Sequence, residues 1–159
     1  ALQRDELYAA MRSTGFLGID DKDTWNDLFF KLFIQEVEPR IPKAEPYFIK
    51  DWPLTVSTMA KRKDESRVER FELYMNGLEI ANGYTELLDV VEQRHRFERD
   101  NFERARSKNK TFAIDEKFLE TLGKLQGPYA GVSIGVDRLL MVLMGKKRIE
   151  DVLINREIP

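Results

Sequence analysis

Cysteine is absent from the 159 residues, which excludes disulfide frameworks, thiol nucleophiles and cysteine-type zinc sites. Neither sign of charge dominates, since 26 basic and 28 acidic side chains give a formal charge of −2 and no overall attraction for nucleic acid. No apolar run approaches the roughly 20 residues that a membrane span needs, and no signal peptide opens the chain. We therefore expect a cytoplasmic protein with no membrane partner.

Histidine occurs once, at His95, in a segment crowded with charged residues, and we interpret it as a solvated side chain rather than a catalytic one. What is present suffices for one core, because 42% of the residues are hydrophobic and 34% are charged. The composition therefore predicts a globular domain.

The N-terminal third predicts two helices. Residues 3–14 have an amphipathic pattern that Gly15 ends. Asp21 or Asp23 is expected to cap the second helix, and Pro39 is expected to end it. An aromatic stripe at helical spacing in this helix is interpreted as core; it comprises Trp25, Phe29 and Phe33.

The remaining two thirds mix strands with helices. The patterns predict a short strand at 47–50, a hairpin at 71–81, helices at 89–107 and 115–124, a buried strand at 130–135 and a core helix at 136–144. A hairpin without repeated βα units indicates an α+β fold on an antiparallel sheet.

The hairpin carries a pair of carboxylates. Asn76-Gly77 is the strongest short signal for a two-residue turn, which would pair Glu72 with Ala81. Because side chains alternate along a strand, Glu72 and Glu79 would share one face, within about 8 Å of each other. Oxygen ligands at this spacing suit magnesium that also binds nucleotide phosphates. The alternative is that both glutamates are ordinary solvated residues.

Glu86 is the third carboxylate of the segment, and its spacing from Glu79 has the wrong parity for a regular strand. A bulge at Asn82-Gly83 would correct the parity and return Glu86 to the same face.

Two segments resemble a known family. Residues 71–87, FELYMNGLEIANGYTEL, resemble the strand pair that precedes motif 3 in lysyl-tRNA synthetases. Residues 131–141, GVSIGVDRLLM, resemble motif 3 of class II synthetases. The resemblance implies that 1–159 is the C-terminal part of a class II catalytic domain, with the hairpin at about 68–87 and motif 3 at about 129–145. It also implies an antiparallel sheet flanked by helices, and activation of an amino acid by ATP as an adenylate.

The resemblance assigns roles to nine residues. Glu72 and Glu79 match magnesium-binding glutamates that also serve ATP, and Arg138 matches the catalytic arginine that holds the ATP phosphates, with Gly135 beside it. The residues implied for the amino acid are Asn82, Gly83, Glu86, Gly131 and Ser133, with Glu86 at the side-chain ammonium. These residue types suit the chemistry, because arginine is a permanent planar cation and glycine admits a ligand close to the backbone.

The family includes true lysyl-tRNA synthetases and a shorter paralogue, the GenX or PoxA type, which attaches (R)-β-lysine to a lysine of elongation factor P. The segments 51–53 and 57–60 depart from the synthetase pattern, the helix segment 96–101 resembles the paralogue, and Ser133 replaces a synthetase glycine. Leu125-Gln126-Gly127 matches neither group. The resemblance favours the paralogue, with ATP, magnesium, lysine or β-lysine, and elongation factor P or tRNA-Lys as partners.

Motifs 1 and 2 are not recognised in the sequence. Arg70-Phe71-Glu72 has the Arg-x-Glu spacing of motif 2, but it lies in the hairpin that precedes motif 3. Two explanations remain open: a longer protein, expected to be a homodimer, supplies both motifs, or the chain is a remnant that works as a binding module. Without motif 2 we expect the isolated chain not to catalyse.

Overall fold

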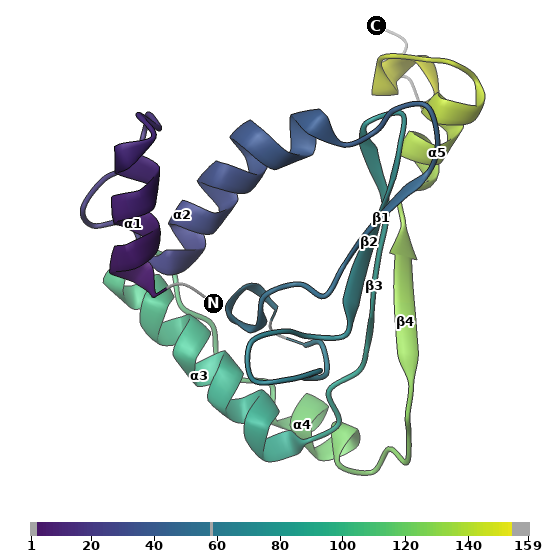
Figure 1. Cartoon of the computed structure of the whole chain (residues 1–159). Coiled ribbons are helices and arrows are strands. Elements are labelled where there is room, and N and C mark those ends of the chain that lie inside the picture. The colour runs from purple at the N-terminus through teal and green to yellow at the C-terminus, as the bar shows by residue number, and fades with distance from the viewer. Residues whose placement is uncertain (1–2, 58, 154–159) are drawn as a thin grey trace, which may run out of the picture. The chain divides into compact units, whose positions relative to one another are not determined.

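The computed structural model describes residues 3–57 and 59–153 (Figure 1). It contains one four-stranded sheet in the order β1-β2-β3-β4, and α-helices precede, separate and follow the strands along the chain. The predicted α+β class is therefore confirmed. The strands are β1 Tyr47–Lys50, β2 Arg70–Met75, β3 Leu78–Thr85 and β4 Ala130–Ile134. The α-helices are α1 Arg4–Ser13, α2 Trp25–Leu32, α3 Val90–Arg106, α4 Glu116–Leu122 and α5 Val136–Leu143.

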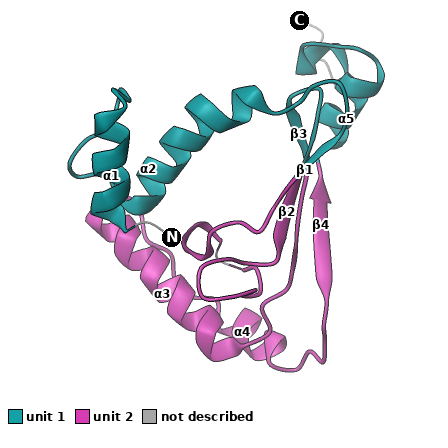
Figure 2. Cartoon of the chain, viewed as in Figure 1, with its two compact units in different colours: residues 1–48, 73–80, 135–159 teal, residues 49–72, 81–134 magenta. Residues whose placement is uncertain are grey.

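The chain divides into two compact units, which Figure 2 colours separately. The first comprises the residues up to 48, the hairpin tip at 73–80 and the residues from 135 onward. The second comprises residues 49–72 and 81–134.

In the first unit, α1 has the predicted extent. It ends where Gly15 adopts a φ of 76° and the Phe16 N–H donates to the Met11 carbonyl at 3.1 Å. Such a left-handed residue after the last turn satisfies the carbonyls that a helix end leaves unpaired.

The predicted cap of α2 is wrong, because Thr24 caps the helix instead of Asp21 or Asp23. The Thr24 hydroxyl accepts from the Asp27 N–H at 3.2 Å, and the Asp27 carboxylate accepts from the Thr24 N–H at 2.8 Å. This reciprocal pair satisfies two N–H groups at once. Asp23 instead accepts a hydrogen bond from Lys31 at 2.6 Å.

Beyond Leu32 the helix changes geometry. A π-helical turn covers Phe33–Val37, and a 3-10 turn at Glu38–Arg40 contains Pro39 and ends the helical stretch. The aromatic stripe stacks along the helix, with ring centroids 5.3 Å apart for Trp25–Phe29 and 5.9 Å for Phe29–Phe33. Of its three rings only Phe33 is buried, so the interpretation of the stripe as core holds for that residue alone.

The helices of the second unit follow the prediction closely. The Asp89 carboxylate accepts from the N–H groups of Val91 and Glu92 at the start of α3, and Asp115 does the same for Phe118 at the start of α4. Aspartate at these positions is favoured because its oxygens satisfy N–H groups that the first turn leaves unpaired. None of the helices within 3–57 and 59–153 is long and apolar enough to cross a membrane.

The C-terminal strand and helix lie where they were predicted, but their predicted burial is wrong. All of β4 is exposed, with Val132 at 55% and Ile134 at 51% of their full accessibility. β4 is the last strand in the order and pairs only with β3, and its two faces, which carry alternate side chains, are both exposed. In α5 Met141 is buried, whereas Val136 and Leu143 are exposed.

The predicted hairpin turn is confirmed. Asn76 and Gly77 both have positive φ angles, 52° and 77°, as a type I′ turn requires. A Cβ added at Gly77 would also lie 3.0 Å from Lys43 Cε, at the far end of a flexible side chain. Backbone strain rather than this contact is therefore the main reason for glycine at this position.

We predict that Gly77→Ala lowers the free energy of unfolding of the chain by about 1–2 kcal/mol, the cost of a left-handed backbone for a residue with a Cβ. Gly77→Asn is the matched control, because asparagine adds the same Cβ but tolerates this conformation, so it should cost less. Urea unfolding measures both variants. Equal losses would assign the effect to the contact with Lys43.

Candidate active site

The second unit holds a buried ion pair on β2. Arg70 Nη2 donates to Glu72 Oε1 at 2.6 Å, and the guanidinium lies 4.6 Å from the ring centroid of Trp52. Glu72 is only 5% exposed, so the alternative of a solvated glutamate is wrong for this residue. A carboxylate buried this deeply needs a cation or several donors to remain charged.

Asn82 joins this pair to β3. Its Nδ2 donates to Glu72 Oε1 at 3.2 Å, and its Oδ1 accepts from Arg70 Nε at 3.2 Å. Two residues with predicted ligand contacts, Glu72 and Asn82, are therefore held by one guanidinium. Arg70 was not predicted as a site residue, although the Arg-x-Glu spacing of residues 70–72, which resembles motif 2, was a signal in the sequence that pointed to it.

The contact between Glu72 and Asn82 reveals an extra residue in β3. A regular hairpin with this two-residue turn would place Ala81, not Asn82, beside Glu72. Farther from the turn, the Thr85 N–H donates to the Glu69 carbonyl at 3.0 Å, again one residue out of that register. Ile80 and Ala81 are both buried although they are consecutive, as expected at a bulge. The predicted bulge therefore exists, but it precedes Asn82 instead of lying at Asn82-Gly83.

Toward β4 the same strand is regular. Asn82 lies opposite Ser133 and Tyr84 opposite Gly131, without interruption from Ala81 to Thr85. Directly opposed residues in an antiparallel pair project to the same side of the sheet. The predicted amino-acid residues Asn82, Ser133 and Gly131 thus share one face, together with Tyr84.

A cavity of about 410 Å³ opens on this face. The residues that line it come from the segment before β2 and from three strands: Val56, Ser57, Met59, Ala60, Arg70, Asn82, Tyr84 and Ser133. Its volume suits a small molecule of amino-acid size.

Glu86 follows β3 by one residue, on the same side as Asn82 and Tyr84 by alternation. It forms a single bridge with Ala60, and its N–H donates to the Tyr129 carbonyl at 2.9 Å. A Cβ at Gly131 would lie 3.1 Å from the Glu86 carboxylate, so glycine there makes room for the carboxylate.

Burial raises the pKa of Glu86 above its ordinary value of 4.5. Burial also raises the pKa of Tyr84, and the negative charge of Glu86 adds to that effect. The raised pKa of Glu86 means that its charged form is not fully compensated within the protein. A cationic group of a ligand would stabilise that charged form.

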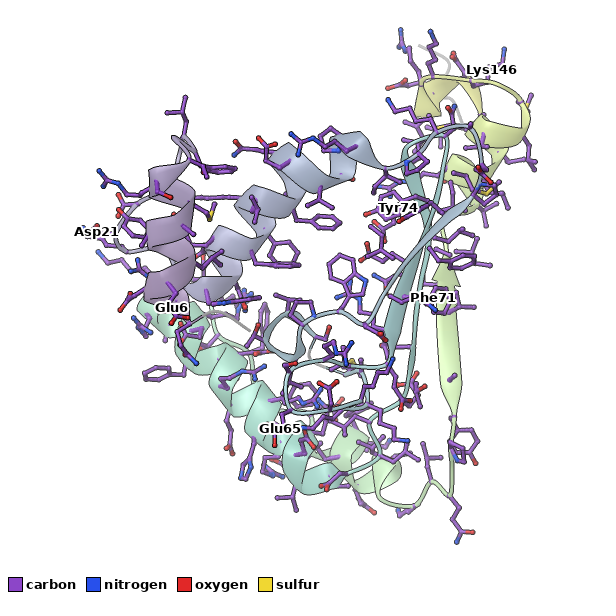
Figure 3. All side chains as sticks on the ribbon, viewed as in Figure 1. Glu6, Asp21, Glu65, Phe71, Tyr74 and Lys146 are labelled. Carbon is purple, nitrogen blue, oxygen red and sulfur yellow. The ribbon has the colours of Figure 1, made fainter. Side chains whose placement is uncertain are left out.

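Gly83 has a packing role in addition to its predicted contact with the amino acid. A Cβ at this position would lie 2.8 Å from the ring of Phe71, labelled in Figure 3, and 2.9 Å from the Gly131 carbonyl. By alternation it projects to the face opposite Asn82 and Tyr84. Its predicted contact with the amino acid remains a prediction, and only its backbone is suited to make one.

The first unit brings together two of the predicted ATP residues. Arg138, in the first turn of α5, donates from Nη1 to the Glu79 backbone carbonyl at 2.9 Å and lies 3.6 Å from the Glu79 carboxylate. The arginine side chain is 51% exposed, so its guanidinium remains accessible to an anionic ligand. A helix start adds backbone N–H groups that favour anions.

Gly135 precedes α5, and its N–H donates to the Ile80 carbonyl at 2.8 Å. A Cβ there would meet Arg138 Cδ at 3.6 Å, an ordinary contact. Since packing within the chain does not demand glycine here, close approach of a ligand remains a physical reason for it.

The family model that describes class II tRNA synthetases (D, K and N) matches residues 8–155, and the chain belongs to this family. The chain is 41% identical to the elongation factor P–(R)-β-lysine ligase of Haemophilus influenzae (strain PittGG) over 153 residues, which are 95% of this chain and 47% of that relative. It is 35% identical to the lysine–tRNA ligase of Pelotomaculum thermopropionicum over 153 residues, 94% of this chain and 30% of that relative.

The corresponding ligases of Proteus mirabilis and Buchnera aphidicola are 41% and 42% identical over 136 and 130 residues. The chain spans about half the length of the β-lysine ligases that it matches. The family is thereby established, whereas the activity of a whole protein containing this chain is a matter for proposal.

The raised pKa of Glu86 gives a prediction about pH. A carboxyl group whose pKa is higher in the folded state destabilises the fold as pH rises from the unfolded value through the folded one. Glu86→Gln should therefore stabilise the chain at pH 7 relative to wild type, with the advantage vanishing near pH 4. Thermal unfolding at both pH values measures this, with Glu120→Gln, at an exposed glutamate paired with Lys124, as the control. A stability loss at pH 7 would contradict the assigned environment of Glu86.

Proposed function

We propose that residues 1–159 form the C-terminal part of the catalytic domain of an ATP-dependent ligase that activates lysine or (R)-β-lysine as an aminoacyl adenylate. The acceptor is proposed to be a lysine of elongation factor P. The observation that carries this proposal is the shared face of Asn82, Tyr84, Ser133 and Glu86, with its cavity of amino-acid size.

Glu86 does not line the cavity itself, but it lies on the same face of the sheet, and its chemistry favours a substrate with a terminal ammonium. Glu86 is a partly buried carboxylate whose pKa is raised by burial. An ammonium group beside it would supply the missing counter-charge, and a neutral side chain would not. Asn82 and Ser133 supply neutral hydrogen-bonding groups on the same face for the polar end of the substrate.

Arg138 is proposed to hold the ATP phosphates, because it is a permanent cation, half exposed and already oriented by the Glu79 carbonyl. As pyrophosphate leaves, negative charge grows on its oxygens, and a preorganised guanidinium stabilises that charge. Gly135 is proposed to admit the nucleotide close to the backbone.

Magnesium is proposed to bind Glu72 and Glu79. Within 3–57 and 59–153 no group of three acidic, histidine or cysteine side chains could hold a metal by itself. Two carboxylates nevertheless suit magnesium, which keeps waters and shares its coordination sphere with phosphate oxygens. When bound, the metal would neutralise phosphate charge. Glu79, one-third exposed beside Arg138, fits such a place more readily than Glu72, which Arg70 and Asn82 already engage.

The choice between acceptors rests on the relatives. Four of the β-lysine ligases are 41–42% identical to this chain, whereas the lysine–tRNA ligase is 35% identical. Elongation factor P is accordingly the proposed acceptor, and tRNA-Lys the alternative. A homodimer, and motifs 1 and 2 outside this chain, belong to the same proposal about the full-length protein.

For the ATP site, we predict that Glu79→Gln in the full-length protein lowers magnesium-dependent ATP–pyrophosphate exchange at least about 100-fold, the usual loss for a group that supports transition-state charge. Arg138 should keep its orientation in this variant, because its hydrogen bond goes to the Glu79 backbone carbonyl. Glu120→Gln is the matched control and should leave the exchange unchanged. Wild-type exchange rates in Glu79→Gln would remove the metal assignment.

For the amino-acid site, we predict that the full-length protein activates (R)-β-lysine better than lysine, because the hydroxymethyl group of Ser133 occupies space that glycine would leave open. Pockets discriminate such one-bond shifts by about 1–3 kcal/mol. Ser133→Gly should narrow or reverse the preference, as measured by kcat/KM for both amino acids. A wild-type preference for lysine that the glycine leaves unaltered would favour the lysine–tRNA ligase alternative.

A further inference from the structure

A buried guanidinium lies beneath one wall of the amino-acid cavity. Arg96 projects from the middle of α3, and its side chain is only 4% exposed. Its Nη1 donates to the Ser57 carbonyl at 3.2 Å and to the Ala60 carbonyl at 2.7 Å. Its Nη2 donates to Glu92 Oε1 at 2.5 Å, one helical turn earlier.

The segment that Arg96 holds is the cavity wall itself. Ser57, Met59 and Ala60 line the cavity, yet none of them belongs to a helix or a strand of the sheet. No regular strand ladder runs along such a segment, so its carbonyls are satisfied one at a time, here by Arg96 for Ser57 and Ala60. Arginine is suited to this task, because its planar fork can reach two carbonyls and a carboxylate at once.

The same wall is paired with the strand end that carries Glu86. Ala60 forms a single bridge with Glu86, the Leu87 N–H donates to the Met59 carbonyl at 3.0 Å, and the Lys61 N–H donates to the Thr85 carbonyl at 2.7 Å. Arg96 therefore holds one side of a short backbone segment whose other side is hydrogen-bonded around Glu86.

Glu92 keeps the guanidinium in place. It also accepts hydrogen bonds from Arg62 at 3.1 and 3.3 Å. Burial acts to raise the pKa of Glu92, but the hydrogen bonds from Arg96 and Arg62 outweigh it, so that pKa lies below its ordinary value. The carboxylate is thus charged at neutral pH and compensates the buried cation.

We infer that Arg96 is a positioning residue for amino-acid recognition: by bonding the Ser57 and Ala60 carbonyls, it sets the wall that faces Asn82 and the backbone that orients Glu86. This inference rests on the proposed function, because it takes the cavity to be the amino-acid site. Arg96 does not line the cavity, and its effect on the substrate is transmitted through the wall.

The test compares Arg96→Gln and Arg96→Lys with Arg99→Gln in the full-length protein. Arg99 lies on the same helix and forms an ion pair with the adjacent Asp100 at 3.1 Å. One readout is the KM for lysine and β-lysine against the KM for ATP in pyrophosphate exchange. The other readout is hydrogen exchange at two backbone amides. The Lys61 amide donates to Thr85 at the strand end, and the Leu87 amide donates to Met59 in the wall.

Arg96→Gln should raise the amino-acid KM about tenfold or more, while the KM for ATP stays within about twofold. Without its donor the wall shifts so that its carbonyls reach other partners, and substrate binding must restore the original wall at about the cost of one unsatisfied buried carbonyl. Exchange at the Lys61 and Leu87 amides should speed up in parallel. Arg96→Lys, which keeps the charge but reaches fewer acceptors, should recover part of both effects, and Arg99→Gln should match wild type.

An unchanged amino-acid KM in a folded Arg96 variant would overturn the inference, and so would equal rises of both KM values. If Arg96→Gln fails to fold, Arg96→Lys decides by the same two readouts. Absence of amino-acid-dependent exchange in the wild-type protein would instead remove the proposed function. In that case unchanged amide exchange at Lys61 and Leu87 in the variants would also overturn the role of Arg96 in holding the wall.

Discussion

Which side chains meet at the cavity depends on how β3 pairs with its two neighbours. Toward β4 the pairing is regular, and it places Asn82 opposite Ser133 and Tyr84 opposite Gly131. Toward β2 one extra residue before Asn82 brings this amide against Glu72. Without that residue, alternation would turn Ala81 and Gly83 to this face, and the amide, the phenol and the carboxylate of Glu86 would project away from Arg70. The candidate site therefore exists because a single strand is regular on one edge and irregular on the other.

Two guanidinium groups hold the polar groups on this face, of which Glu72 is buried and Asn82 is partly buried. Arg70 binds Glu72 and Asn82 on the strand side, and Arg96 binds the carbonyls of Ser57 and Ala60 on the loop side. Each guanidinium has a carboxylate partner, which a charge at this depth requires. Rigid arginine forks hold the amide, the carboxylate and the wall in place before any substrate arrives, and such preorganisation is what a selective pocket needs.

Local signals predicted the elements well, and they predicted burial poorly. The Asn76-Gly77 turn, the helices predicted to start near residues 89 and 115 and the helix end at Gly15 all depend on neighbouring residues and were predicted correctly. The exposure of β4 depends on which elements lie next to it in the fold, and local patterns in a single sequence do not reveal that. The α2 cap was misassigned because Thr24 competes with two nearby aspartates, and only the reciprocal bonds with Asp27 decide between them.

The residues of the candidate site were predicted better than the backbone geometry that positions them. Asn82, Glu86, Gly131 and Ser133 were identified from motif resemblance, and the described structure places all four around β3 and β4. The bulge was predicted at Asn82-Gly83 because glycine is common in bulges. In the structure it precedes Asn82, where the consecutive residues Ile80 and Ala81 are both buried. The positioning role of Arg96 could not be predicted, because two of its acceptors are backbone carbonyls 36 and 39 residues away, which leave no trace in side-chain patterns.

The central claim is that one face of β3 and β4 binds the amino-acid part of an adenylate. Hydrogen exchange of the full-length protein, with and without a non-hydrolysable lysyl-adenylate analogue, tests it most directly. The account predicts added protection of backbone amides in 82–86 and 131–135, and little change in α4, whose residues are absent from the cavity lining. Protection confined to other segments, with 82–86 and 131–135 unchanged at saturating analogue, would contradict it.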